Sequence, residues 1–257
     1  MDPDEQEDFS DRLAILGEPR AEFAVRGRLL LRNFIVAPVL VLAGIAIELM
    51  AFLFLRHSFE LISIGIGLIL AGIMLVVRGY RNRGLRVLVF PEGLIRMCRG
   101  AGQAMFWDEI ETVWRRKTEG HWEAIFKGSL TYAIQRADGK SIHFDDAVPR
   151  LDELGKILKK QTFPHLWPRY LAAFDKGASI DFGKVRLSRR GLSTESGKLG
   201  WHEVQEIKFE ENKAAISKKG KWTAWFQCSV SEIPNYHVFK ALTERALALR
   251  GTQPVQG

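Results

Sequence analysis

The sequence predicts an α+β membrane protein, in which an N-terminal transmembrane helical hairpin precedes two β-sheet units that each end in an amphipathic helix. Three observations lead to this fold class. Two long apolar stretches follow one another near the N-terminus. The rest of the chain shows short strand patterns separated by turn residues. A motif written FWDEIETVW from residue 106 returns as GWHEVQEIKF from residue 200, which indicates two copies of one unit.

Residues 1–33 open with the acidic stretch MDPDEQEDFSD, which is typical of a mobile tail. Residues 34–77 then form the predicted transmembrane hairpin. Its first apolar stretch, 34–55, carries a single charge, and its second, 61–77, carries none. A helix crosses the hydrocarbon core with roughly 20 apolar residues, and about 17 suffices. The first stretch starts too late and is too long for a signal peptide. A buried helical hairpin of a soluble protein is the alternative.

Arginines flank the hairpin on both outer sides, whereas the connecting residues RHSFE offer one arginine and one glutamate. Cationic flanks stay on the cytoplasmic side of a membrane. Both termini are therefore expected in the cytoplasm, and the protein is expected in the plasma (inner) membrane. Each arginine near the surface also attracts anionic headgroups by about 1 kcal/mol. The flanking residues are Arg26, Arg28, Arg32, Arg78, Arg81 and Arg83.

Two features inside the apolar stretches are candidates for function. Glu48 is the one intramembrane charge, and such residues are functional candidates by default. In the other interpretation it reaches the outer interface. The second stretch offers it no ionisable partner, which argues against a proton relay. Gly67 and Ala71 are spaced for close approach of two helices.

Residues 84–160 are expected to form the first β unit. Strand-like stretches surround a Pro-Glu-Gly-Leu turn, and residues 105–116 read as one strand that holds the motif. Residues 129–146 read as a hairpin whose Asp138-Gly139 pair is the signal of a type I′ turn. Residues 151–158 then carry leucines at helical spacing.

A connector, 161–178, leads to the second β unit at 179–250, where the same order of predicted elements recurs. It contains a Gly-Leu turn, the motif strand, a hairpin that turns at Lys219-Gly220, and a closing amphipathic helix for which Asn235 is the expected cap. Several elements that recur in one order are typical of a duplication.

The repeated motif itself is interpreted as structural rather than as a site. Its tryptophans and its Ile/Val residues are expected to pack on opposite faces of a curved sheet. Its glutamates are expected near the rim, where a carboxylate can bond a loop backbone. The motif residues are Trp107, Glu109 and Ile110 in the first copy and Trp201, Glu203 and Val204 in the second.

Strands with a Gly-Leu turn, a W-x-E-[IV] strand and a closing helix resemble the bacterial pleckstrin-homology-like (PH-like) domains over residues 84–250. Several such proteins carry a two-helix membrane anchor beside the domain. The resemblance implies a fold that binds ligands through loops and grooves and rarely catalyses. Each copy is nearer five strands than the seven of a full PH barrel, so closure of each copy alone and a shared sheet system both stay open.

No catalytic, cofactor or metal motif emerges, so we expect no enzyme activity, no cofactor and no metal site. The six histidines are scattered without metal-ligand spacing, and neither a nucleophile elbow nor a P-loop is present. Cys98 and Cys228 both fall in the predicted cytoplasmic part, where disulfides are rare.

The hairpin of the second copy holds the candidate binding residues, which are aromatic and basic side chains close in sequence: Lys218, Lys219, Lys221, Trp222 and Trp225. Such a mixture can bind a membrane surface or nucleic acid. Core aromatics beside a solvated lysine turn are the alternative. Membrane tethering favours a lipid or a protein, and no nucleic-acid partner is expected.

Two functions remain from the sequence. The first is a membrane-anchored interaction or scaffold protein that presents paired PH-like units to a protein partner or to anionic lipid headgroups. The second is a subunit of a membrane enzyme or transporter complex with an unrecognised site.

Overall fold

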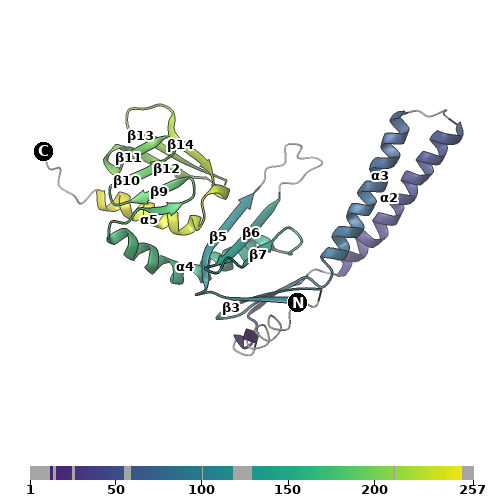
Figure 1. Ribbon diagram of the computed structural model, residues 1–257, viewed down its shortest axis with the longest axis horizontal. Coiled ribbons are helices and arrows are strands. Elements are labelled where there is room, and N and C mark those ends of the chain that lie inside the picture. Colours follow the sequence, from purple (N-terminus) through teal and green to yellow (C-terminus); the bar gives the residue numbers. More distant parts are fainter. Residues whose placement is uncertain are drawn as a thin grey trace. The chain divides into compact units, whose positions relative to one another are not determined.

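The protein is a mixed α+β structure, seen here in a computed structural model that describes residues 12–13, 16–24, 27–54, 59–99, 101–117, 129–210 and 212–250 (Figure 1). These residues form four helices and four antiparallel sheets. The contacts divide the chain into two compact units. The first unit is residues 1–104 with 147–149, and the second is residues 105–146 with 150–257.

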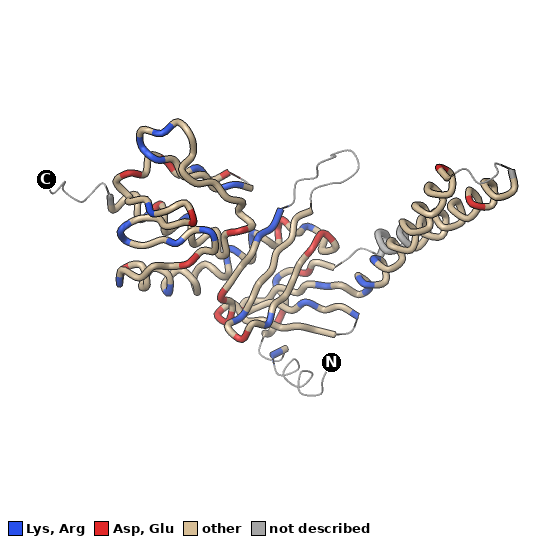
Figure 2. The backbone as a smooth tube through the Cα atoms, turned by 45° about the horizontal axis from the view of Figure 1, so that its top comes forward, with Lys and Arg blue, Asp and Glu red and all other residues tan. Residues whose placement is uncertain are grey.

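Helices α2 (Gly27–Phe54) and α3 (Phe59–Arg81) lie side by side in the first unit (Figure 1). Both are long and apolar enough to cross a membrane, with mean hydropathies of 2.4 over Phe34–Leu53 and 2.5 over Phe59–Arg81. In the described part of this pair, the charged residues lie toward its two ends, except for Glu48 within the first apolar span (Figure 2). The two predicted apolar helices are thus confirmed, and α2 begins several residues before its apolar stretch.

Glycines allow α2 and α3 to approach closely. A Cβ atom on Gly44 would lie 2.7 Å from the carbonyl oxygen of Gly65, and one on Gly72 would lie 2.8 Å from the carbonyl oxygen of Ala37. Real Cβ atoms do not tolerate such distances, so the backbones are in contact because side chains are missing. The predicted close-approach pair does not take part in this contact, since Gly67 is exposed with open space around it.

The first unit also contains a four-stranded sheet in the order β1-β2-β3-β4. Its strands are β1 (Ala21–Ala24), β2 (Arg86–Val89), β3 (Gly93–Cys98) and β4 (Ala101–Phe106). The sequence predicted no element before the first apolar stretch, and β1 corrects this. Ala24 pairs with Arg86, so the helical hairpin is an insertion between two paired strands. A strand of four residues is too short to show a pattern of its own, and its partner β2 lies beyond the whole helical hairpin, so the neighbouring sequence does not predict it.

The predicted single strand over 105–116 is also wrong. The chain leaves β4 at Phe106, turns at residues 107–109, and resumes as β5 (Ile110–Lys117). The second copy does the same, because Trp201–Glu203 form a short 3-10 helix between two strands. The tryptophan and the glutamate of the motif therefore lie in a turn. The alternation of side chains between the two faces of a strand, on which their placement was predicted, does not apply to them.

The second unit begins with the three-stranded sheet β5-β6-β7, whose later strands are β6 (Leu130–Arg136) and β7 (Ser141–Phe144). The hairpin is present as predicted, but its turn is not type I′. Only Gly139 has positive φ, 84°, and its N–H donates to Arg136 at 3.0 Å. This is a type I turn followed by a glycine bulge, the next commonest hairpin connection.

Helix α4 (Leu151–Asp175) follows and runs through most of the predicted connector, 161–178. The helix continues past Pro164 and Pro168 because its buried face is unbroken: Leu158, Thr162, Leu166 and Phe174 are all buried. Its second half packs on the core of the second copy, as shown by Leu166 and Phe174. Packing thus outweighs the local cost of two prolines.

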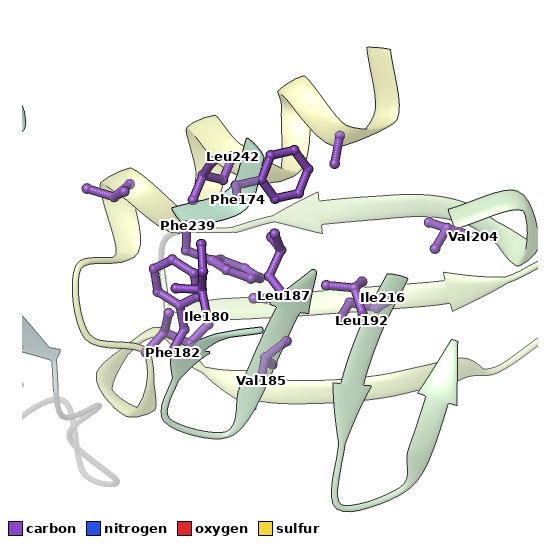
Figure 3. Close-up of a cluster of buried hydrophobic side chains, with 14 of the residues drawn as sticks. Phe174, Ile180, Phe182, Val185, Leu187, Leu192, Val204, Ile216, Phe239 and Leu242 are labelled. Carbon is purple, nitrogen blue, oxygen red and sulfur yellow. The ribbon is translucent and has the colours of Figure 1, made fainter. Parts of the chain in front are cut away.

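The second copy forms two sheets, β8-β9-β10-β11 and β12-β13-β14, and ends in helix α5 (Tyr236–Arg250). A single apolar cluster fills the space between these sheets, α4 and α5 (Figure 3). Phe182 and Phe239 meet edge to face with ring centroids 5.2 Å apart. The strands are β8 (Ile180–Phe182), β9 (Val185–Ser188), β10 (Gly191–Thr194), β11 (Gly197–Gly200), β12 (Val204–Phe209), β13 (Lys213–Lys218) and β14 (Ala224–Ser229).

Both copies follow one order along the chain: a four-stranded sheet, the motif turn, a three-stranded sheet and a long helix. The entry to each helix is also repeated. Val148-Pro149-Arg150 precedes α4 and Ile233-Pro234-Asn235 precedes α5, with left-handed φ values of 55° at Arg150 and 50° at Asn235. Among the described residues, all four sheets are open and none closes into a barrel.

Candidate functional site

The tryptophans of the motif are core residues in both copies. Trp107 is 2% exposed and Trp201 is 6% exposed, and Ile110 and Val204 are fully buried. Trp201 also donates from its indole nitrogen to the carbonyl oxygen of Ser188 at 2.9 Å. These side chains are thus placed for packing and not for contact with a ligand.

The glutamates of the motif fix the turn. Glu203 accepts a hydrogen bond from the Gly200 N–H at 3.1 Å and pairs with Lys218 Nζ at 2.7 Å. The bond to Lys218, followed by the bond from Gly200, lowers the pKa of the Glu203 carboxyl. The first copy repeats the arrangement, since Glu109 accepts from the Phe106 N–H at 3.2 Å.

A basic residue at the same strand position completes the turn in each copy. Arg136 lies opposite Ile110 and sits 3.6 Å from Glu109, while Lys218 lies opposite Val204. Lys218 is therefore engaged by the motif glutamate. This separates it from the other lysines predicted for the binding site.

The turn between β13 and β14 carries Lys219, Lys221 and Trp222, whereas Trp225 lies in β14. The basic residues of this part of the chain are coloured blue in Figure 2. Lys219 and Lys221 are exposed, and no acidic side chain in the described part of the chain pairs with either. Trp222 follows Lys221 in the same turn. Its relative exposure is 105%, so its side chain is fully exposed to solvent. Trp225 differs, because it is half-buried and packs against the core. The structure thus isolates three of the five predicted residues, Lys219, Lys221 and Trp222, as one exposed tip.

The predicted arginines flank the helices as the sequence places them. Arg78 and Arg81 are exposed in the last turns of α3, and Arg83 is exposed just after it. Arg26 and the side chains of Arg28 and Arg32 lie outside the described residues.

The turn between β3 and β4 closes the end of α3, which the sequence did not reveal. Arg99 has a left-handed φ of 54°, donates from Nε to the Tyr80 carbonyl oxygen at 3.4 Å, and lies 4.6 Å above the Tyr80 ring. Cys98 Sγ donates to the Arg81 carbonyl oxygen at 3.2 Å. These contacts satisfy carbonyl groups that a helix end leaves open, and they fasten the first sheet to the helical hairpin.

Glu48 faces the other helix of the hairpin. Its Oε1 atom is buried without a hydrogen-bond partner, and a Cβ atom on Gly65 would lie 2.7 Å from it. Gly65 thus provides the space that the carboxyl group occupies.

Asn235 joins the two copies, although the sequence suggested only a helix cap. It is fully buried, and its side chain bonds β5 of the first copy rather than its own helix. Oδ1 accepts from the Val113 N–H at 2.8 Å, and Nδ2 donates to the Glu111 carbonyl oxygen at 2.7 Å and to the Tyr170 hydroxyl at 2.8 Å. The Asn235 N–H also donates to the Val113 carbonyl oxygen at 2.9 Å.

The described ranges contain no cluster of metal ligands, and the Cys228 thiol is buried. They contain no group of three or more His, Cys, Asp or Glu residues that could hold a metal ion. Both cysteines are free thiols. Burial raises the pKa of the Cys228 thiol to about 11, so it stays protonated at neutral pH.

Comparison with known proteins gives a family for nearly the whole chain. A family model described as "Family of unknown function (DUF6585)" matches residues 6–252. The chain belongs to this family. The matched range includes the helical hairpin and both copies of the β unit. No curated protein matches the chain.

Proposed function

We propose that the protein is a non-enzymatic, membrane-anchored interaction protein whose second copy docks on an anionic membrane surface through the exposed tip. In this proposal α2 and α3 span the plasma membrane, and both termini lie in the cytoplasm. The basic residues at the outer ends of the hairpin support this orientation. Each copy is a PH-like unit, supported by a four-stranded sheet, a three-stranded sheet and a closing helix in each copy.

The observation that carries the docking proposal is the fully exposed Trp222 beside two unpaired lysines. Tryptophan prefers the membrane–water interface because its ring is apolar and its N–H is polar. Lysines beside it attract anionic headgroups. A monomer in water gains nothing from a bare indole at the end of a hairpin, so the tip is suited to a surface that covers it.

The magnitudes predict reversible docking. Burying about half of an indole surface of roughly 200 Å² contributes about 2.5 kcal/mol. Each lysine near an anionic surface contributes about 1 kcal/mol. A tethered module has an effective concentration on the order of 1 mM, so these terms leave the docked and free states comparably populated. Loss of anionic lipid should lower the docking equilibrium constant roughly 30-fold, because it removes about 2 kcal/mol from the two lysines, and this makes docking sensitive to lipid composition.

The test uses the full chain, because a fragment that starts at residue 84 would lack β1, which pairs with β2. The chain is placed in vesicles with brominated neutral or brominated anionic lipids, and tryptophan quenching is measured across a salt series. We expect stronger quenching in anionic vesicles, lost at high salt and lost in Trp222→Ala.

Two matched variants separate the tip from general charge. Lys219→Glu with Lys221→Glu should remove the anionic preference, whereas Lys198→Glu, an exposed position on strand β11 of the same copy, should keep it. Lys218 is left intact because it pairs with Glu203. Equal quenching in wild type and Trp222→Ala under all lipid conditions would contradict docking and redirect the search to a protein partner.

A further inference from the structure

The two copies of the β unit differ at one sheet edge, which is covered in the first copy and open in the second. In the first copy this edge is β5, and residues of the second copy lie against its outer side. The Val113 N–H donates to Asn235 Oδ1 at 2.8 Å, and the Val113 carbonyl oxygen accepts from the Asn235 N–H at 2.9 Å. Asn235 thus takes the place of a neighbouring strand.

The corresponding strand of the second copy is β12, since the repeated motif aligns Val113 with Ile207. The two strands are built alike. Both pair antiparallel with the strand that follows, and both registers shift just after the first residue. Ile207 lies opposite Ile216, as Val113 lies opposite Ile134. The edge that Asn235 covers on β5 therefore has a counterpart on β12.

Backbone groups of β12 point outward along this edge. The Glu210 N–H donates to the Lys213 carbonyl oxygen at 2.9 Å, so these two residues form a hydrogen-bonded pair of the β12-β13 ladder. Hydrogen-bonded and non-hydrogen-bonded pairs alternate along an antiparallel ladder. Counted back from Glu210, the N–H and C=O groups of Phe209 and Ile207 therefore point away from β13.

No other element of the described residues completes this edge. β12 pairs with β13 alone, and no hydrogen bond from another element reaches the N–H or C=O group of Ile207. The Ile207 side chain is partly buried, whereas Val113 is buried. A row of unpaired backbone groups is a template for pairing with another strand. The edge of β12 is thus suited to a strand from outside the chain.

The charges on β12 fit a second copy of the same strand. Glu206 and Lys208 flank Ile207, both side chains are more than half exposed, and Oε2 and Nζ lie 3.5 Å apart. An exposed ion pair contributes little, so both charges are available to a neighbour. When two β12 strands pair antiparallel about Ile207, Glu206 of each chain lies opposite Lys208 of the other. A parallel pairing in register would bring like charges together, which is unfavourable.

We propose that β12 is a dimerisation edge, at which two copies of the chain join their sheets into one antiparallel sheet centred on Ile207. The N–H and C=O groups of Ile207 bond to their counterparts, and the Phe209 N–H bonds to the Gln205 carbonyl oxygen of the other chain. Gln205 corresponds to Glu111, whose carbonyl oxygen accepts from Asn235 Nδ2 at 2.7 Å. The interface is isologous, so it closes with two chains. Pairing through β12 does not depend on docking of the exposed tip.

Disulfide trapping tests the register in the full chain. Two differently tagged chains, Glu206→Cys and Lys208→Cys, are reconstituted together in vesicles of neutral lipid, where the exposed tip has no anionic surface to dock on. In the proposed register the two cysteines form a non-hydrogen-bonded pair with Cα atoms about 4.5 Å apart, which a disulfide bridges. Two Glu206→Cys chains place their cysteines roughly 8 Å apart, which is beyond its reach.

Lys198→Cys is the matched control, because it places an exposed cysteine on β11, another edge strand of the same copy. The wild-type chain measures the background from the native thiols. We expect a mixed disulfide yield about tenfold above that of Lys198→Cys and above that of either β12 variant alone. A mixed yield at the level of Lys198→Cys, or equal yields from one β12 variant alone, would overturn the proposal.

Charge reversal tests the pairing without cysteines. Glu206→Lys and Lys208→Glu each place like charges across the interface at both ends, so each should dimerise about tenfold more weakly than wild type. Energy transfer between labelled full chains in the same neutral vesicles measures this. A mixture of the two variants restores opposite charges at both ends and should restore the transfer, which also shows that both variants fold. No transfer in wild type, or equal transfer in each variant and in their mixture, would contradict dimerisation through β12.

Discussion

Asn235→Ala should be among the most destabilising single substitutions in the second unit. The change removes three side-chain hydrogen bonds and leaves the buried Val113 N–H without its acceptor. An unsatisfied buried polar group costs about 1–3 kcal/mol, and a lost hydrogen bond about 1 kcal/mol. Alanine at the left-handed φ of 50° adds about 1–2 kcal/mol. We expect a loss of about 3–5 kcal/mol, a large share of a typical domain stability.

Equilibrium denaturation of the full chain in detergent, followed by tryptophan fluorescence, measures this loss. Asn235→Gly separates the two causes, because glycine accepts positive φ and loses only the hydrogen bonds. Arg150→Ala is the matched control, since Arg150 holds the same left-handed position before α4 but makes no side-chain cap. It should cost about 1 kcal/mol or less. A loss below about 1 kcal/mol in Asn235→Ala, or equal losses at both positions, would refute the view that Asn235 joins the copies.

Further predictions concern pH, helix contact and thiol reactivity. Burial and Lys159 lower the folded pKa of His237 to about 4, so the unfolded chain takes up the proton first, and stability should fall by at most about 3 kcal/mol as pH drops from 6.5 to 4. His237→Gln should flatten this decline in denaturation curves. Gly72→Val should loosen the helical hairpin, measured as a lower melting temperature in detergent, whereas Gly67→Val should not, because Gly72 lies against α2 and Gly67 has open space around it. The Cys228 thiol should resist maleimide until the chain unfolds, and fast native labelling would contradict its burial.

Patterns that repeat locally predicted much of the fold. The apolar stretches predicted two helices, and the duplicated motif predicted two copies with matching hairpins and closing helices. Leu151, Leu154 and Leu158 of α4 are buried as their helical spacing indicates, and so are Phe239 and Leu242 of α5. In each of these cases, the signal lies within a few turns or strands of sequence.

Features that depend on distant parts of the chain escaped prediction. Strand β1 pairs across the whole helical hairpin, and α4 continues through two prolines because the second copy covers its far half. The candidate tip was predicted as five residues, yet only the fold shows that Glu203 engages Lys218 and that the core holds Trp225. Arg150 and Asn235 each follow a Val-Pro or Ile-Pro pair, and this pair is visible in the sequence. The hydrogen bonds from Asn235 to β5 do not follow from the pair.

The most direct test of the account replaces Trp222 with a photoreactive benzophenylalanine in the full chain and irradiates the native membrane. The tip is fully exposed, so the substitution disturbs no packing. The account predicts lipid adducts at residue 222 that disappear when Lys219 and Lys221 are both changed to glutamate. Adducts to protein alone, or lipid adducts that persist without the two lysines, would contradict docking of the second copy on an anionic membrane.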